Sequence, residues 1–132
     1  MKLSDLTALG RVPIDPRYPT NLAIAAISLL VVVAGAIWQL VLGTALLESI
    51  LWGIGAGFLP FLTWALGREL DPDHDLSAFV GTGLVLFTFL LPDMPSLLII
   101  VWLLSLLRMV NRSVGLPAKP WDSLGVLGLG AW

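Results

Sequence analysis

The chain contains an uninterrupted apolar run, LAIAAISLLVVVAGAIWQLVLG at positions 22–43, in which no residue carries a charge. An α-helix rises about 1.5 Å per residue, so this run can cross a hydrocarbon core of about 30 Å. The chain as a whole is also apolar, with 58% hydrophobic residues, 12% charged residues and a mean hydropathy of +0.95. A soluble domain could not cover so much apolar surface with so few charges. The sequence therefore predicts an all-α integral membrane protein.

Small residues at 34–36, AGA, lie inside the apolar run and are also typical of a signal-peptide cleavage site. The polar segment before the run is long and is interrupted by Pro13, Pro16 and Pro19, and the apolar run continues past the small residues. We therefore expect an uncleaved anchor helix.

Four apolar segments are predicted to cross the membrane as two helical hairpins, at residues 22–43, 45–66, 76–91 and 94–110. The last two are only marginally long enough to span. The expected organisation is a cytoplasmic lead-in at 1–20, a four-helix transmembrane domain at 21–111 and a cytoplasmic or interfacial tail at 112–132. The tail becomes apolar again from Leu124, and the sequence leaves open whether it re-enters the membrane.

The basic residues predict the orientation of these four spans. All seven fall on one side of the membrane in a four-span arrangement: Lys2, Arg11, Arg17, Arg68, Arg108, Arg112 and Lys119. Lys and Arg are enriched in cytoplasmic loops. We therefore expect a multi-pass protein of the cell membrane with both termini in the cytoplasm.

Small residues also mark the faces where these helices are expected to pack. Gly53 and Gly57 are four residues apart in the second span, and Gly81 lies on a small polar stripe of the third. Small side chains let helix backbones approach closely in lipid. The sequence predicts helix packing at these three glycines.

The segment GRELDPDHDLSAF at 67–79 holds four carboxylates and the only histidine of the chain. Two arginines at the end of the fourth span are predicted to lie on the same side of the membrane. The candidate polar site therefore consists of Glu69, Asp71, Asp73, His74, Asp75, Arg108 and Arg112.

A structural role explains most of this segment. Asp73 or Asp75 can cap the helix that starts near Leu76, and Arg68 complements the negative end of the preceding helix. Arg108 and Arg112 can pair with the acidic loop or clamp lipid phosphates. A protein-interaction role for the loop also stays open.

Metal binding is the remaining hypothesis for the acidic segment. A calcium loop starting at Asp71 would need a glycine where Leu76 stands and a glutamate where Thr82 stands. Zinc would need ligands that a chain with one histidine and no cysteine does not supply. Magnesium with a phosphorylated lipid is chemically feasible, although the carboxylates form one cluster instead of spaced pairs. No metal site or cofactor is predicted.

Two functions follow from these residues. The favoured one is a non-enzymatic accessory or scaffold subunit, because no nucleophile or cofactor motif is recognisable and the catalytic residues are unknown. The alternative is a cytoplasm-facing, magnesium-dependent enzyme or transporter subunit that acts on a phosphorylated lipid. Expected partners are membrane lipids, with a homo-oligomer or another membrane protein left open. Nucleic acid is not expected at a net charge of −2 without a binding motif.

Overall fold

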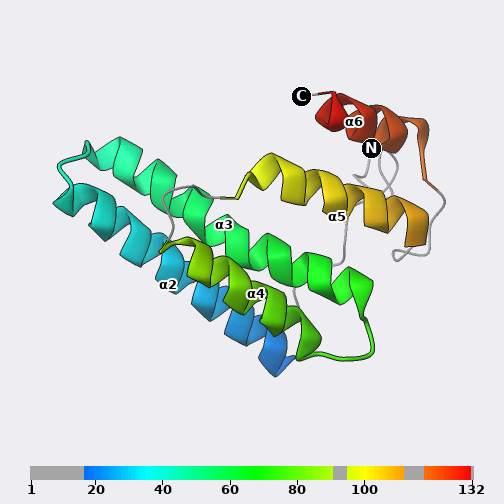
Figure 1. Cartoon of the computed structure of the whole chain (residues 1–132), viewed down its shortest axis with the longest axis horizontal. Coiled ribbons are helices and arrows are strands. Elements are labelled where there is room, and N and C mark those ends of the chain that lie inside the picture. Colours follow the sequence, from blue (N-terminus) through cyan, green and yellow to red (C-terminus); the bar gives the residue numbers. More distant parts are fainter. Residues whose placement is uncertain (1–16, 91–94, 112–117, 132) are drawn as a thin grey trace.

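The computed structural model describes residues 17–90, 95–111 and 118–131. Within these ranges the chain is all-helical and has no strand. Its five helices are α2 (Pro19–Val41), α3 (Leu46–Leu70), α4 (Ser77–Thr88), α5 (Leu97–Asn111) and α6 (Pro120–Gly130). Figure 1 shows α2 and α3 as a long hairpin, with α4 and α5 beside the second half of α3 and α6 beyond α5.

Two of these helices are long and apolar enough to cross a membrane. α2 has 23 residues and α3 has 25, which correspond to about 35 Å and 38 Å. α2 begins at Pro19, in the first helical turn, where the missing N–H of proline is not needed. Pro19 interrupts the polar segment of the sequence, and in the structure it is the first residue of α2.

A four-residue connection at 42–45 joins α2 to α3. Gly43 has a φ of +86°, a left-handed conformation that favours glycine. The N–H of Gly43 donates to the carbonyl of Leu40, and the N–H of Thr44 donates to the carbonyl of Gln39. These two bonds form a Schellman motif, which satisfies the last carbonyls of α2 and turns the chain back.

α3 is the central helix, because it packs against α2, α4 and α5. Gly53 allows the contact with α2, since a Cβ there would lie 2.5 Å from the carbonyl oxygen of Val32. A Cβ on Gly57 would lie 2.8 Å from the carbonyl oxygen of Ser28. Small residues thus let the two backbones touch over two turns.

α4 approaches α3 through a second pair of small residues. A Cβ on Gly67 would lie 2.7 Å from the Cα of Ala78, which is itself buried. One turn further along α4, a Cβ on Gly81 would lie 3.3 Å from the Cγ2 of Thr63. The first of these contacts leaves no room for a larger side chain.

The core lies where α2, α3, α4 and α5 converge. It consists of Ile24, Trp64, Ala65, Ala78 and Leu104, with Phe61, Leu62, Leu66 and Phe79 packed around it. Each of the four helices supplies at least one of these residues. The first half of α3 lies outside this core and has α2 as its main neighbour (Figure 1).

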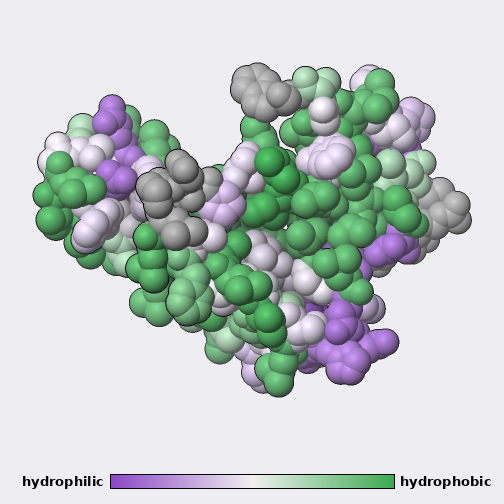
Figure 2. Space-filling view, viewed as in Figure 1, coloured by the Kyte–Doolittle hydropathy of each residue, from purple (hydrophilic) through white to green (hydrophobic). Residues whose placement is uncertain are grey.

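Apolar side chains cover most of the surface seen in Figure 2, and hydrophilic residues gather mainly toward the ends of the helices. α2 is the clearest case, because only 6% of its most apolar window is buried. Leu29, Leu30 and Val41 are among its exposed side chains. Such a surface is suited to lipid or to other apolar partners.

The helix bounds differ from the predicted spans mainly at their ends. α3 continues four residues beyond position 66, so Glu69 belongs to a helix and not to a loop. α4 is shorter than the predicted 76–91 and begins at Ser77, and α5 begins at Leu97 instead of 94. The turn at 92–93 and the lead-in up to residue 16 lie outside the described residues.

Gly53→Ala should destabilise the hairpin, and Gly55→Ala in the same helix is its control. The new methyl at 53 meets two backbone atoms of α2, Val32 O at 2.5 Å and Ala36 N at 2.9 Å. Its overpacking cost of about 1–3 kcal/mol exceeds the gain in helix propensity of about 1 kcal/mol. At Gly55 the nearest atom, Leu97 Cδ1, is 3.8 Å away.

The measurement is reversible unfolding of both variants in detergent micelles, followed by circular dichroism. We expect the free energy of unfolding to fall for Gly53→Ala and to stay level or rise for Gly55→Ala. Equal stability of the two variants would contradict the close approach of α2 and α3.

Candidate functional site

Charged side chains gather at one end of the bundle, which we call the polar end. It comprises the last turn of α3, the connecting loop at 71–76 and the last turn of α5. The polar end contains six of the seven residues of the predicted polar site. Arg112, the seventh, lies outside the described residues.

A buried ion pair joins α3 to α5 at the polar end. The Nε of Arg108 donates to Oε1 of Glu69 at 3.0 Å, and the side chains are only 16% and 2% exposed. The Nδ2 of Asn111, one turn further along α5, donates to the backbone carbonyl of Glu69 at 3.3 Å. Two side chains from one face of α5 therefore hold the last turn of α3.

The position of Glu69 explains why it needs this partner. Burial disfavours a carboxylate, and the C-terminal turn of a helix adds the negative end of the helix dipole. Arg108 lies in the last turn of its own helix, where a cation is favoured. The pair thus compensates two unfavourable contributions at Glu69, and removal of one member takes this compensation away from the other buried charge.

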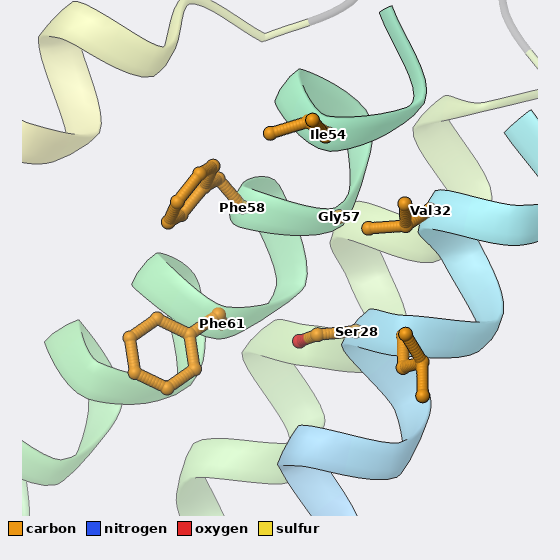
Figure 3. Close-up of a pocket in the computed structure, with 7 residues that line it drawn as sticks. Ser28, Val32, Ile54, Gly57, Phe58 and Phe61 are labelled. Carbon is orange, nitrogen blue, oxygen red and sulfur yellow. The ribbon is translucent and has the colours of Figure 1, made fainter. Parts of the chain in front are cut away.

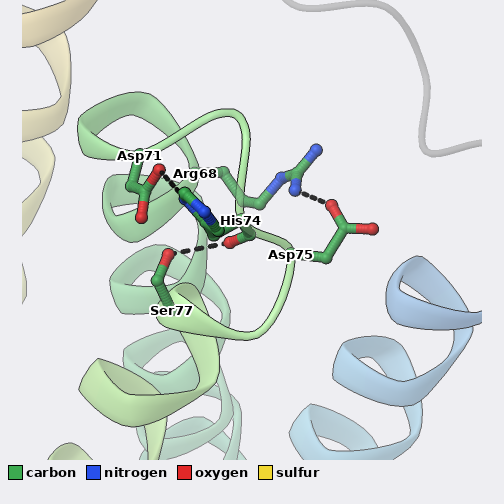
Figure 4. A network of polar contacts seen from close by, with 5 residues as sticks. All are labelled: Arg68, Asp71, His74, Asp75 and Ser77. Atoms are coloured by element: carbon green, nitrogen blue, oxygen red, sulfur yellow. Dashed lines mark hydrogen bonds and ion pairs between the residues drawn. The ribbon is translucent and has the colours of Figure 1, made fainter.

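The loop after α3 forms its own polar network, shown in Figure 4. Arg68 in the last turn of α3 pairs with Asp75, and His74 Nδ1 lies 2.9 Å from Asp71 Oδ1. The hydroxyl of Ser77 donates to the backbone carbonyl of His74 at 2.8 Å. These contacts join the end of α3, the loop and the start of α4.

The His74–Asp71 contact shifts both groups in the expected directions. Hydrogen bonding to Asp71, helped by its charge, raises the pKa of His74 above its usual value of 6.5. Hydrogen bonding to His74 lowers the pKa of Asp71 below 3.8. Both side chains are exposed to water, so the pair adds little to the stability of the fold.

The predicted helix caps are wrong. Leu76 occupies the N-cap position of α4, and no side chain bonds to the first N–H groups there. Asp75 pairs with Arg68 instead, because the end of α3 brings the guanidinium within reach of the loop. Asp73 remains exposed. Asp75 therefore connects to α3 and Asp71 connects to His74 within the loop, and neither caps α4.

The described residues contain no group of three or more His, Cys, Asp or Glu side chains placed to hold a metal ion. No protein-family model matches the chain, and no curated protein or solved structure matches it either.

The geometry of the polar end sets what it can do chemically. Its contacts are ion pairs within the chain, and they tie helix ends together.

An apolar groove lies away from the polar end, between α2 and α3 (Figure 3). It has a volume of about 280 Å³ and is lined by Ser28, Leu29, Val32, Ile54, Gly57, Phe58 and Phe61. Sequence reasoning named Gly57 as a packing residue but did not predict the groove. Two phenylalanines one turn apart in the second predicted span, Phe58 and Phe61, were the available signal.

Three buried polar atoms have no hydrogen-bond partner among the described residues. They are the hydroxyl oxygens of Ser28 and Thr63 and the indole nitrogen of Trp64. Other helical hydroxyls, such as those of Thr82 and Ser105, donate to carbonyls one turn back. Ser28 points from α2 toward α3 beside the groove (Figure 3).

Glu69→Leu and Arg108→Met should each destabilise the protein strongly, whereas the double variant should recover most of the loss. Each single change removes the oppositely charged group beside a buried charge, and breaking a buried pair in this way costs about 3–5 kcal/mol. The double change replaces the pair with apolar groups of similar length, and such replacements are often nearly neutral.

A double-mutant cycle measured by unfolding in micelles tests this coupling. The exposed Asp73→Asn is the control and should change the free energy of unfolding little. A double variant whose loss equals the sum of the two single losses would show that Glu69 and Arg108 are not coupled.

The His74–Asp71 pair should be present only within a pH window. Its contribution is lost as the pH rises through the raised pKa of His74, and also as the pH falls through the lowered pKa of Asp71. His74 is the only histidine, so its imidazole gives one NMR titration curve. We expect a midpoint above 6.5 that falls in Asp71→Asn and stays unchanged in Asp73→Asn.

An unchanged His74 midpoint in Asp71→Asn would contradict the pairing. A fall of similar size in both variants would assign the shift to the general negative charge of the loop and not to Asp71.

Proposed function

We propose that this chain is a multi-pass membrane protein in which α2, α3, α4 and α5 all cross the bilayer, with the polar end in the cytoplasm. The lengths and apolar surfaces of α2 and α3 support their crossing. α4 and α5, with 12 and 15 residues, extend only about 18 Å and 22 Å. Local thinning of the bilayer or the flanking residues would supply the remaining length.

The positions of the basic residues support the orientation. Arg17 precedes α2, Arg68 lies in the last turn of α3, Arg108 lies in the last turn of α5, and Lys119 precedes α6. All four therefore belong to the polar end or to a helix start on its side. By the positive-inside rule this side faces the cytoplasm.

Within the membrane, we propose a non-enzymatic accessory or scaffold role. The observation that carries it is the buried Glu69–Arg108 pair. An enzyme acting on a phosphorylated lipid would direct carboxylates toward a metal ion and cations toward phosphate. Here the arginine of α5 is directed at a carboxylate of α3, which fastens one helix to another.

The loop contacts support the same proposal. Arg68 faces Asp75 and His74 faces Asp71, so four more charged or titratable groups are engaged inside the chain. The exposed apolar side chains in the first half of α3 supply a surface for contacts within the bilayer. They include Leu46, Leu47, Leu51, Ile54 and Phe58. Lipids, a second copy or another membrane protein would be the partners of this surface.

The Asp71→Ala/Asp73→Ala/Asp75→Ala triple variant tests the proposed role. We expect it to stay folded, because its lost ion pairs are exposed and each contributes about 1 kcal/mol or less. After mild-detergent purification from the native host, it should retain the same co-purifying proteins as the unmodified chain. Millimolar Mg²⁺ or Mn²⁺ should leave the Tm of both proteins unchanged relative to a salt of equal ionic strength.

Two results would overturn the accessory role. One is a Tm increase specific to divalent ions that the triple variant loses, which would favour the magnesium-dependent alternative. The other is a phosphorylated lipid that co-purifies with the unmodified chain and is absent from the triple variant.

A further inference from the structure

α6 runs antiparallel to α5 along its length (Figure 1). Near the start of α6, the Ser123 hydroxyl lies 3.9 Å from the sulfur of Met109. Further along, the indole Nε1 of Trp102 donates to the carbonyl of Val126 at 3.1 Å. A Cβ on Gly130 would lie 2.9 Å from the same nitrogen. As the numbering rises along α6, the contacts move back along α5 toward its start.

These contacts give the depth that α6 reaches beside α5. Trp102 lies nine residues before the end of α5, which corresponds to about 14 Å along the helix axis. From Pro120 to Gly130, α6 rises by about 15 Å. With the Asn111 end of α5 at the cytoplasmic boundary, the end of α6 lies near the middle of a core of about 30 Å.

The charges of α6 are confined to its start. Pro120 occupies the first turn, and Oδ2 of Asp122 accepts the backbone N–H of Lys119 at 2.9 Å. Asp122 is buried and lies at the positive end of the helix dipole, which favours a carboxylate. No residue from Ser123 to Ala131 carries a charge. The residues of α6 are therefore polar where the helix begins near the polar end and apolar where it runs away from that end.

A helix that lies on the membrane surface has a charged face toward water and an apolar face toward lipid. α6 lacks such a charged face beyond its first turn. Its Leu124 and Leu127 are instead apolar and exposed, with 58% and 69% of their surface accessible. On α5, Ile99 and Leu103 are also exposed and apolar. The exposed sides of both helices suit the same apolar surroundings.

We infer that α6 enters the bilayer from the cytoplasmic side alongside α5, with Leu124 and Leu127 against lipid acyl chains. This inference rests on the proposed membrane topology, and it replaces the expected interfacial tail over residues 120–130. Trp102 fixes α6 at its depth through the indole hydrogen bond and through close contact at Gly130.

Site-directed spin labelling tests this depth directly, because the chain has no native cysteine. Single cysteines at the exposed positions Trp121, Leu124 and Leu127 would carry a methanethiosulfonate nitroxide in liposomes. Accessibility to oxygen, which partitions into lipid, is compared with accessibility to a water-soluble nickel chelate. We expect depth to increase from 121 to 127, with 127 close to a reference label at Leu103.

Labels at Leu30 in α2 and Asp73 in the loop separate this inference from the proposed topology. Leu30 should report lipid and Asp73 should report water. If the labels at Leu30 and Leu103 report lipid while the label at 127 reports water or an interfacial depth, the insertion of α6 is overturned and the proposed topology is not. Water at Leu30 and Leu103 would overturn the membrane topology itself.

A matched pair of glycine variants tests the contact that sets the depth. Gly130→Ala places a methyl against the Trp102 indole, whereas the position of a Cβ at Gly128 has no atom within 4 Å. With the label at Leu127, Gly130→Ala should increase nitroxide mobility and Gly128→Ala should not. Identical spectra for the two variants would show that Trp102 does not hold α6. That result would overturn the inferred depth of α6.

Discussion

The Glu69–Arg108 ion pair joins the last turn of α3 to the last turn of α5. Two buried charges are tolerable only together, so the pair requires α5 to lie against the last turn of α3. α5 in turn carries Trp102, the residue that contacts α6. A polar contact at the end of α3 and the core residue Leu104 thus both hold α5, and α5 in turn contacts α6.

α3 meets two different packing requirements along its length. Its first half contacts α2 through Gly53 and Gly57, where backbones approach and little side-chain volume is buried. Its second half carries Trp64 and Ala65 into the core shared with α2, α4 and α5. The helix bundle is therefore thick at the polar end and reduces largely to a hairpin at the other end. Ion pairs and the apolar core stabilise the same half of the molecule.

Local sequence patterns predicted the helical class and the two long apolar helices, because uncharged runs determine both. They did not predict that α3 continues to Leu70, since glycine and charged residues after position 66 favour a loop. In the structure Gly67 serves the close approach of Ala78. The partner of Arg108 lies 39 residues away, and composition alone could not choose between Glu69, the loop carboxylates and a lipid phosphate.

The separation of Glu69 and Arg108 has a consequence for biosynthesis. The two residues are 39 positions apart, so at about 5–20 residues per second Arg108 is made about 2–8 s after Glu69. The α2–α3 hairpin is complete during that interval, before the guanidinium of Arg108 has been made. The contact between Glu69 and α5 therefore forms only after the α2–α3 hairpin has been made, so the final seating of α3 against α5 is a late event in synthesis.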